Sequence, residues 1–405
     1  MAGAIEFVDG GTVTTPGGFR AGATYAGLKT YAEDKLDLGL ILSEAPCNAA
    51  GVYTTSTIVS PSVTVTKEHV GGGPVRAVVV NAGIANTCVG NQGFEDAKEM
   101  AALAAQHLGV QQREVVVCST GIIGVELPMS LIRTGIDQII LTDDGGHAVA
   151  RAMMTTDTRP KEVAVTFQLD GRQVTMGGVT KGSGMIHPNM ATMLAFITTD
   201  AAVDPEYLRP TLREVADASF NMMTVDGDTS TNDTLLVLPN GTAGNRPITA
   251  GSADAETFKE ALLAVCVHLA REMARDGEGA SRLITVDVVG AVDIGDARKA
   301  ARSIASSSLV KSAVYGADPN WGRVLMALGK SGASAEESKI DLFLNGVCIM
   351  QNGLPVPFHR DAVVALMRGP EVTFRVQLNL GEGDATAWGC DLTEEYVIIN
   401  SAYTT

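Results

Sequence analysis

The chain has 405 residues, which is enough for two or three domains or for one large two-lobed body. Its 46 acidic and 30 basic residues give a formal net charge of −16, and such an acidic surface repels nucleic acid and anionic membranes. The N-terminus has no basic and apolar regions of a secretory signal, and no apolar run reaches the length of a membrane span. We therefore expect a cytoplasmic protein.

Strands and helices are predicted to alternate along the chain. Strands are expected at residues 38–42, 63–66, 75–80, 115–118, 163–169, 173–176, 193–198, 234–238, 283–289, 341–344, 372–378 and 396–399. Helices are expected at residues 94–108, 129–140, 145–154, 205–220, 257–275 and 297–310. This order, with a hairpin around residues 170–171, favours an α/β (α+β) body of mixed sheets flanked by helices over a purely parallel sheet.

Several familiar sites have little support in the sequence. The six cysteines are scattered and show no zinc-binding spacing, so free and mostly buried thiols are expected. The six histidines are dispersed, which gives no support to a histidine-based triad. Asp226, Asp228 and Asp233 form only a fragment of a calcium loop, because the closing glutamate is missing. No metal site is predicted.

The most informative segment is KGSGMIHPNMATML, residues 181–194. In it Thr192 follows the small Ala191, and Pro188 stiffens the approach to the bond between them. Taken alone, Thr192 reads as an ordinary strand threonine, whose hydroxyl is a poor nucleophile without a base. If the Thr192 hydroxyl attacked the Ala191 carbonyl and water cleaved the ester, the freed α-amine of Thr192 would supply that base.

This segment closely resembles the self-cleavage site of the ornithine acetyltransferases of arginine biosynthesis. The resemblance covers nearly the whole chain, and it includes NAGIAN at 81–86, STGIIG at 119–124, MTTDT at 154–158, DGEG at 276–279, ADPNWGR at 317–323 and INSAY at 399–403. It implies acetyl transfer from N-acetylornithine to glutamate through an acetylated Thr192. No metal or organic cofactor is implied, and the resemblance leaves open whether acetyl-CoA also serves as a donor.

The resemblance also assigns roles to residues. Cleavage between Ala191 and Thr192 would give an α chain, residues 1–191, and a β chain, residues 192–405, which begins with the nucleophile. Thr120 and Gly121, at the tip of a predicted strand, would form the oxyanion hole. Substrate binding would fall to Thr158, Lys181, Thr192, Glu278, Asn400 and Thr405. Taken alone, Lys181, Glu278 and Asn400 would be read as exposed positions.

For the fold, the resemblance implies a layered sandwich of the N-terminal-nucleophile type to which both halves contribute strands. The two fragments would stay together and assemble as a heterotetramer of two α and two β chains. The residues leave two other functions open. An N-terminal-nucleophile amidase or aminopeptidase would use the same hydroxyl and amine with water as the acceptor, and an uncleaved relative would be a binding or scaffold protein.

Overall fold

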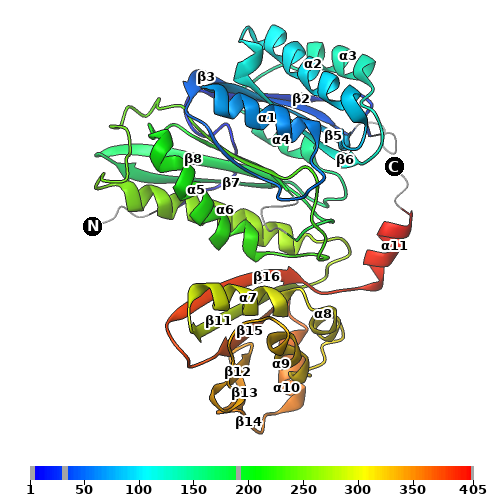
Figure 1. Cartoon of the computed structure of the whole chain (residues 1–405), viewed down its shortest axis with the longest axis vertical. Coiled ribbons are helices and arrows are strands. Elements are labelled where there is room, and N and C mark those ends of the chain that lie inside the picture. Colours follow the sequence, from blue (N-terminus) through cyan, green and yellow to red (C-terminus); the bar gives the residue numbers. More distant parts are fainter. Residues whose placement is uncertain (1–4, 30–34, 188–192, 403–405) are drawn as a thin grey trace.

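The computed structural model describes residues 5–29, 35–187 and 193–402, so Ala191, Thr192 and Thr405 lie outside the described residues. The described residues form three sheets. Two of them build the upper body in Figure 1 and the third builds the lower lobe. None of the helices in the described ranges has the length and apolarity that a membrane span requires.

The central sheet of the upper body has six strands in the order β1-β7-β8-β9-β10-β4. Their bounds are β1 Glu6–Val8, β4 Ala50–Tyr53, β7 Lys161–Leu169, β8 Arg172–Lys181, β9 Leu194–Thr199 and β10 Thr234–Pro239. The predicted hairpin is confirmed, because β7 and β8 pair antiparallel around Asp170, which has a φ of 51°. β8 also pairs antiparallel with β9, so strands from both sides of the predicted cut are neighbours in one sheet.

The second sheet has the order β2-β3-β5-β6. Its strands are β2 Phe19–Thr24, β3 Leu38–Cys47, β5 Val75–Ile84 and β6 Val115–Ile122. Alternate residues of β5 face opposite sides: Val79 packs with the outer helices, whereas Val78 packs toward the central sheet. The outer helices are α1 Pro61–Gly72, α2 Gly90–Leu108 and α3 Met129–Gln138.

The upper body therefore has four layers, with the two sheets face to face between layers of helices. The helix α4 Gly146–Met153 contributes Val149 and Met153 to the core between the sheets, where they pack with Phe196. On the other side of the central sheet lie α5 Pro205–Ala218 and α6 Ala255–Arg275. This arrangement confirms the predicted layered α/β sandwich of mixed sheets.

The third sheet forms the lower lobe and has the order β14-β13-β12-β15-β11-β16. Its strands are β11 Leu283–Ala291, β12 Asp341–Leu344, β13 Val347–Gln351, β14 Leu354–Pro355, β15 Glu371–Gln377 and β16 Gly383–Cys390. Its helices are α7 Ile294–Ala305, α8 Ser308–Tyr315, α9 Gly322–Gly329 and α10 Arg360–Met367. After β16 the chain returns toward the upper body and ends in α11 Glu394–Ala402 (Figure 1).

Three predicted elements are wrong. Residues 63–66 lie in α1 and not in a strand. The Ser60 side chain accepts the Ser62 N–H and Pro61 occupies the first turn, so these two residues start a helix although β-branched residues follow. Residues 396–399 lie in α11, where the Thr393 hydroxyl accepts the N–H of Glu395. The single helix predicted at 297–310 is two, since Ser307 caps the start of α8.

The cysteines mostly follow the prediction. All six are free, and Cys47, Cys118, Cys266 and Cys390 are buried. Cys88 is exposed, which the expectation of buried thiols did not anticipate.

Candidate active site

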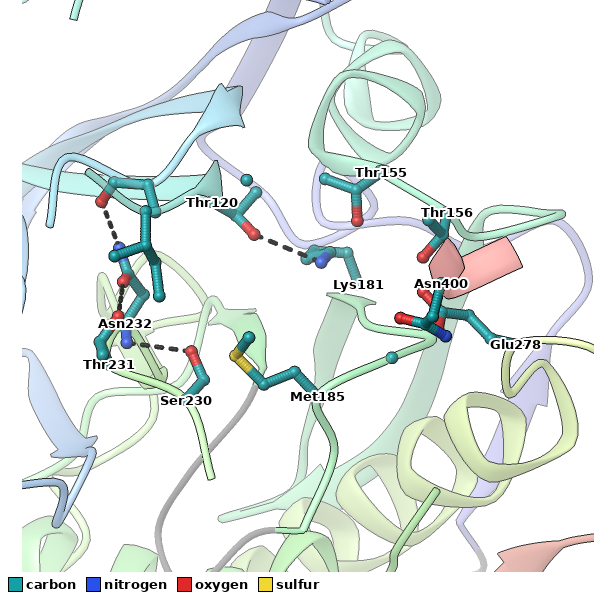
Figure 2. Close-up of a pocket in the computed structure, with 14 residues that line it drawn as sticks. Thr120, Thr155, Thr156, Lys181, Met185, Ser230, Thr231, Asn232, Glu278 and Asn400 are labelled. Atoms are coloured by element: carbon teal, nitrogen blue, oxygen red, sulfur yellow. Dashed lines mark hydrogen bonds between the residues drawn. The ribbon is translucent and has the colours of Figure 1, made fainter. Parts of the chain in front are cut away.

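A polar pocket lies where several chain segments of the upper body end and α11 returns to meet them (Figure 2). Its volume is about 170 Å³, which is small beside the roughly 300–1,000 Å³ typical of drug-sized ligand sites and suits a small metabolite. The residues that line it are Ala85, Thr120, Gly121, Ile123, Thr155, Thr156, Lys181, Gly184, Met185, Ser230, Thr231, Asn232, Glu278 and Asn400.

Figure 2 shows the neutral residues Thr120, Thr231 and Asn232 on one side of the pocket. Together with Ala85 and Gly121, which also line the pocket, they form what we call the neutral wall. Gly121 ends the regular part of β6 with a φ of 133°, in a region that favours glycine. A Cβ at this position would lie 2.1 Å from the carbonyl carbon of Gly83 on the neighbouring β5. Only glycine therefore allows the two strand ends to approach this closely.

Asn232 ties the neutral wall together. Its buried Nδ2 donates hydrogen bonds to the carbonyl oxygens of Ala85, at 2.6 Å, and Ser119, at 2.8 Å. Ala85 directly follows β5, and Ser119 directly precedes Thr120 on β6. One amide group therefore holds the ends of both strands. The Thr87 hydroxyl in turn donates to Asn232 Oδ1 at 2.9 Å, which fixes the orientation of the amide.

The opposite side consists of Lys181, Glu278 and Asn400, which we call the charged wall. Lys181 is the last residue of β8, and its Nζ donates to Thr120 Oγ1 at 3.3 Å, so it reaches across to the neutral wall. Glu278 lies just beyond the end of α6 and accepts a hydrogen bond from Asn400 Nδ2 at 2.7 Å. Gly184 makes room for this pair, because a Cβ there would lie 2.4 Å from the Glu278 carboxylate.

The two ionisable residues of the charged wall are far less exposed than their residue types suggest, whereas Asn400 is exposed. Lys181 has an exposed fraction of 8% and Glu278 one of 9%. Burial lowers the pKa of Lys181, although the negative charges of Asp157 and Glu278 oppose that shift. A buried cation and a buried carboxylate that both face a small pocket can bind the carboxylate and the ammonium group of an amino acid.

A fully buried ion network lies behind the charged wall. Lys161 Nζ lies 2.6 Å from Asp157 Oδ1 and 2.6 Å from Asp276 Oδ2. Asp157 Oδ1 also accepts the N–H of Gly182 at 2.8 Å. The Asp276 carboxylate accepts both the N–H and the hydroxyl of Thr158. Thr158 thus contacts this network, whereas Thr155 and Thr156 line the pocket.

A further buried acid, Asp233, lies beside the site. Asp233 has an exposed fraction of 4%, and its Oδ2 has no hydrogen-bond partner among the described residues. Burial raises its pKa well above the ordinary value of 3.8, although the Met193 N–H and the charge of Lys181 oppose the shift. The fold therefore favours the protonated form of this carboxyl, which lies beside the pocket.

Both flanks of the predicted cut are anchored in the described structure. On one side His187 Nδ1 lies 3.0 Å from Thr224 Oγ1, and its Nε2 lies 3.1 Å from an Arg302 nitrogen on α7. On the other side the Met193 carbonyl accepts the N–H of Thr234 at 2.8 Å. The predicted nucleophile Thr192 and its neighbour Ala191 follow His187 and precede Met193 in the sequence, and they are outside the described residues.

The structure brings together five of the residues that the sequence singled out: Thr120, Gly121, Lys181, Glu278 and Asn400 line one pocket. Ala191, Thr192 and Thr405 lie outside the described residues, so their roles stay predictions. The sequence reasoning missed Asn232 and Asp157, and it considered Asp233 only as a weak calcium ligand. The polar run STND at residues 230–233, directly before an apolar strand, was the available signal. No cluster of three or more metal-ligating side chains occurs within the described ranges.

Comparison with known proteins gives a consistent result. A model of the ArgJ family matches residues 20–405. The arginine biosynthesis bifunctional protein ArgJ of Symbiobacterium thermophilum is 52% identical over 403 residues, 99% of this chain and 100% of that protein. Its namesake from Dehalococcoides mccartyi is 48% identical over 405 residues, all of both chains. A crystal structure of the Bacillus halodurans protein argJ has 42% identity and a TM-score of 0.52, covering 52% of this chain and 100% of that one.

These matches, together with a pocket suited to an amino acid, define an acyltransferase, an enzyme of the acetyltransferase class of arginine biosynthesis. The chain belongs to the ArgJ family. The family resemblance noted in the sequence is thereby confirmed, and the scaffold alternative loses its support.

Proposed function

We propose that the protein transfers an acetyl group from N-acetylornithine to glutamate through an acetyl ester on Thr192. The observation that carries this proposal is the charged wall, which offers a buried cation and a buried carboxylate within one small pocket of an ArgJ-family chain. The α-carboxylate that both substrates share would bind Lys181, and the side-chain ammonium of ornithine would bind Glu278. Thr120 and Gly121 would stabilise the oxyanion, as expected for neutral donors at a strand tip.

The reaction would proceed in two half-reactions. The Thr192 oxygen attacks the acetyl carbonyl carbon, and its proton passes to the α-amine of Thr192 and then to the leaving nitrogen as the amide bond breaks and ornithine departs. The amine of glutamate next attacks the ester, and the Thr192 hydroxyl is regenerated as N-acetylglutamate leaves. The covalent ester carries the acetyl group in this scheme. If acetyl-CoA is a second donor, it would acetylate Thr192 in the first step. Release of the free thiol of CoA in the presence of glutamate would test this.

We further propose that cleavage between Ala191 and Thr192 activates the enzyme and that residues 1–191 and 192–405 stay together. β8 and β9 support this, since all of β9 pairs with residues 176–181 of β8 and the two strands belong to different fragments. An assembly of two α and two β chains would have about twice the 42.1 kDa of one full chain. The location in the cytoplasm stays a prediction.

The decisive measurement is the intact mass of the purified protein with N-terminal sequencing. We expect a second N-terminus that begins Thr-Met-Leu-Ala-Phe, the residues from 192 onward. A Thr192→Ala variant should remain in one piece and be inactive, whereas Thr192→Ser keeps a hydroxyl and should still cleave. An uncleaved wild-type chain with full activity would refute the mechanism.

The product distribution separates transfer from hydrolysis. With N-acetylornithine and glutamate as substrates, an acetyltransferase yields N-acetylglutamate, whereas an amidase of the same nucleophile class yields free acetate. We expect N-acetylglutamate to exceed acetate, because the charged wall can bind an amino-acid acceptor. Acetate as the main product would favour the hydrolase alternative.

A further inference from the structure

We propose that Asp157 is a positioning residue for the amino-acid substrate: with Lys161 and Asp276 it forms one buried ionic unit that holds Lys181 over the pocket. This inference rests on the proposed function, in which Lys181 binds the substrate carboxylate. Asp157 does not line the pocket, so it acts through its neighbours.

The first step of the argument is the anchoring of the backbone. Asp157 Oδ1 accepts the N–H of Gly182 at 2.8 Å, directly after Lys181, and Oδ2 accepts the N–H of Thr155 at 3.0 Å. One carboxylate therefore fixes the end of β8 and the loop after α4, and each of these segments contributes to the pocket lining.

The second step is the link to the other end of the charged wall. Lys161 joins Asp157 to Asp276, with 2.6 Å to each carboxylate. The backbone carbonyl of Asp276 accepts the Ser183 hydroxyl at 2.8 Å, and the Ser183 carbonyl accepts the Glu278 N–H at 2.9 Å. The unit therefore fixes the spacing between the cation and the carboxylate of the charged wall.

The third step concerns charge. Two carboxylates and one ammonium give the unit a net charge of −1, which balances the buried cation of Lys181. Burial raises the pKa of Asp157, but the nearby charges of Lys161 and Lys181 outweigh it and hold that pKa well below its usual range. Asp157 in return is the largest of the charges that raise the pKa of Lys181 and so oppose the effect of burial. The titratable groups that act on Lys181 are Asp157, Lys161, Glu278, Asp233 and Lys29.

Loss of the Asp157 charge should therefore move the titration of Lys181 downward. An opposite charge within a few ångströms shifts a pKa by about 1–3 units. In Asp157→Asn, Lys181 should lose its proton at a lower pH than in the wild type, so the substrate carboxylate should bind more weakly as the pH rises. A residue that only stabilises the fold would not give this pH dependence.

The experiment measures KM and kcat for N-acetylornithine and for glutamate from pH 6.5 to pH 8.5. For Asp157→Asn we expect KM for both substrates to rise about tenfold more across this range than in the wild type, with kcat changing less. Asp157→Glu keeps the negative charge but lengthens the side chain by one methylene group. KM should therefore be raised, but its dependence on pH should match that of the wild type. A flat KM profile in Asp157→Asn would overturn the inference.

Two further variants make the result unambiguous. Asp200→Asn is the matched control, since Asp200 is also buried and accepts the N–H of Thr175 at the opposite end of β8; its KM profile should match the wild type. Lys181→Met tests the underlying function: an unchanged KM would refute the role of Lys181 itself, separately from Asp157. If Asp157→Asn fails to fold, Asp157→Glu decides alone, and an unchanged or newly pH-dependent KM would overturn the inference.

Discussion

The two walls of the pocket are built from different kinds of groups: the neutral wall from backbone and amide groups, and the charged wall mainly from ionisable side chains. The neutral wall depends on backbone geometry: Gly121 permits a close strand approach, and the Asn232 amide holds two strand tips. The charged wall depends on ions, and a second buried layer of ions supports it. Groups that must stabilise a developing oxyanion gain from rigid, neutral donors, whereas recognition of a zwitterionic substrate requires charges that stay ionised after burial.

This difference implies that substitutions in the two walls should change different kinetic constants. Damage to the neutral wall should lower kcat, because an oxyanion exists only along the reaction path. Under the proposed function, substitutions in the charged wall should raise KM, because they would remove contacts that the substrate makes when it binds.

The largest effect is expected for Gly121→Ala. The added Cβ would lie 2.1 Å from the carbonyl carbon of Gly83, and the φ of 133° disfavours any residue with a side chain. The strand tip must shift and misplace its donors, so kcat should fall about 10²–10³-fold. Steady-state kinetics combined with a thermal melt would separate lost chemistry from lost folding.

Gly251→Ala is the matched control, since a Cβ at Gly251 would meet nothing within 4 Å. It should leave both kcat and the melting temperature unchanged. A Gly121→Ala enzyme with normal kcat would remove the neutral wall from the mechanism.

A smaller effect is expected for Glu278→Gln. The substitution keeps the shape of the side chain but removes the charge that would bind the ornithine ammonium. A hydrogen bond to a charged group contributes about 1.5–3 kcal/mol, which corresponds to a rise in KM for N-acetylornithine of about 10–100-fold. KM for glutamate should change less, because glutamate has no side-chain ammonium, and kcat should stay close to the wild-type value.

The control is Glu395→Gln, an exposed glutamate on the same terminal helix as Asn400. It should leave both KM values unchanged. If Glu278→Gln raised KM equally for the two substrates, Glu278 would instead support the structure of the pocket without contacting the side chain of the substrate.

The sequence predicted more of the neutral wall than of the structure behind the charged wall. Thr120 and Gly121 follow a buried apolar strand, and such a local pattern indicates a strand tip. The link from Lys161 to Asp276 joins residues 115 positions apart, and no local pattern indicates such a contact. Lys and Asp are usually exposed, so composition alone assigns them to the surface.

The terminal helix is a second case in which a tertiary contact could not be predicted from the local sequence. Residues 396–399 are rich in β-branched and aromatic side chains, which favour a strand. In the structure the Thr393 hydroxyl accepts the Glu395 N–H and donates to the Gly279 carbonyl, so α11 starts beside the loop that carries Glu278. That tertiary contact brings Asn400 into the pocket, and it could not be read from the local sequence.

The smallest effect on the kinetics should come from Asp233, which belongs to neither wall; its influence should appear in the pH dependence of stability. Its pKa in the folded protein is raised well above 3.8 by burial, so folding takes up a proton at any pH between the two values. The contribution of Asp233 to stability is therefore greatest at low pH and is lost as the pH rises toward the folded-state pKa. Asp233→Asn cannot titrate, so the variant should gain stability relative to the wild type as the pH increases.

Urea unfolding of both proteins between pH 5 and pH 8 would test this. The difference in free energy of unfolding, variant minus wild type, should grow with pH by at most about 1.4 kcal/mol per pH unit, the limit for one proton. Other titrating groups contribute equally to both proteins and cancel in the difference. Parallel stability curves would mean that Asp233 is ionised in the folded protein, in which case its buried Oδ2 must find a donor among residues close to Met193 or Lys181.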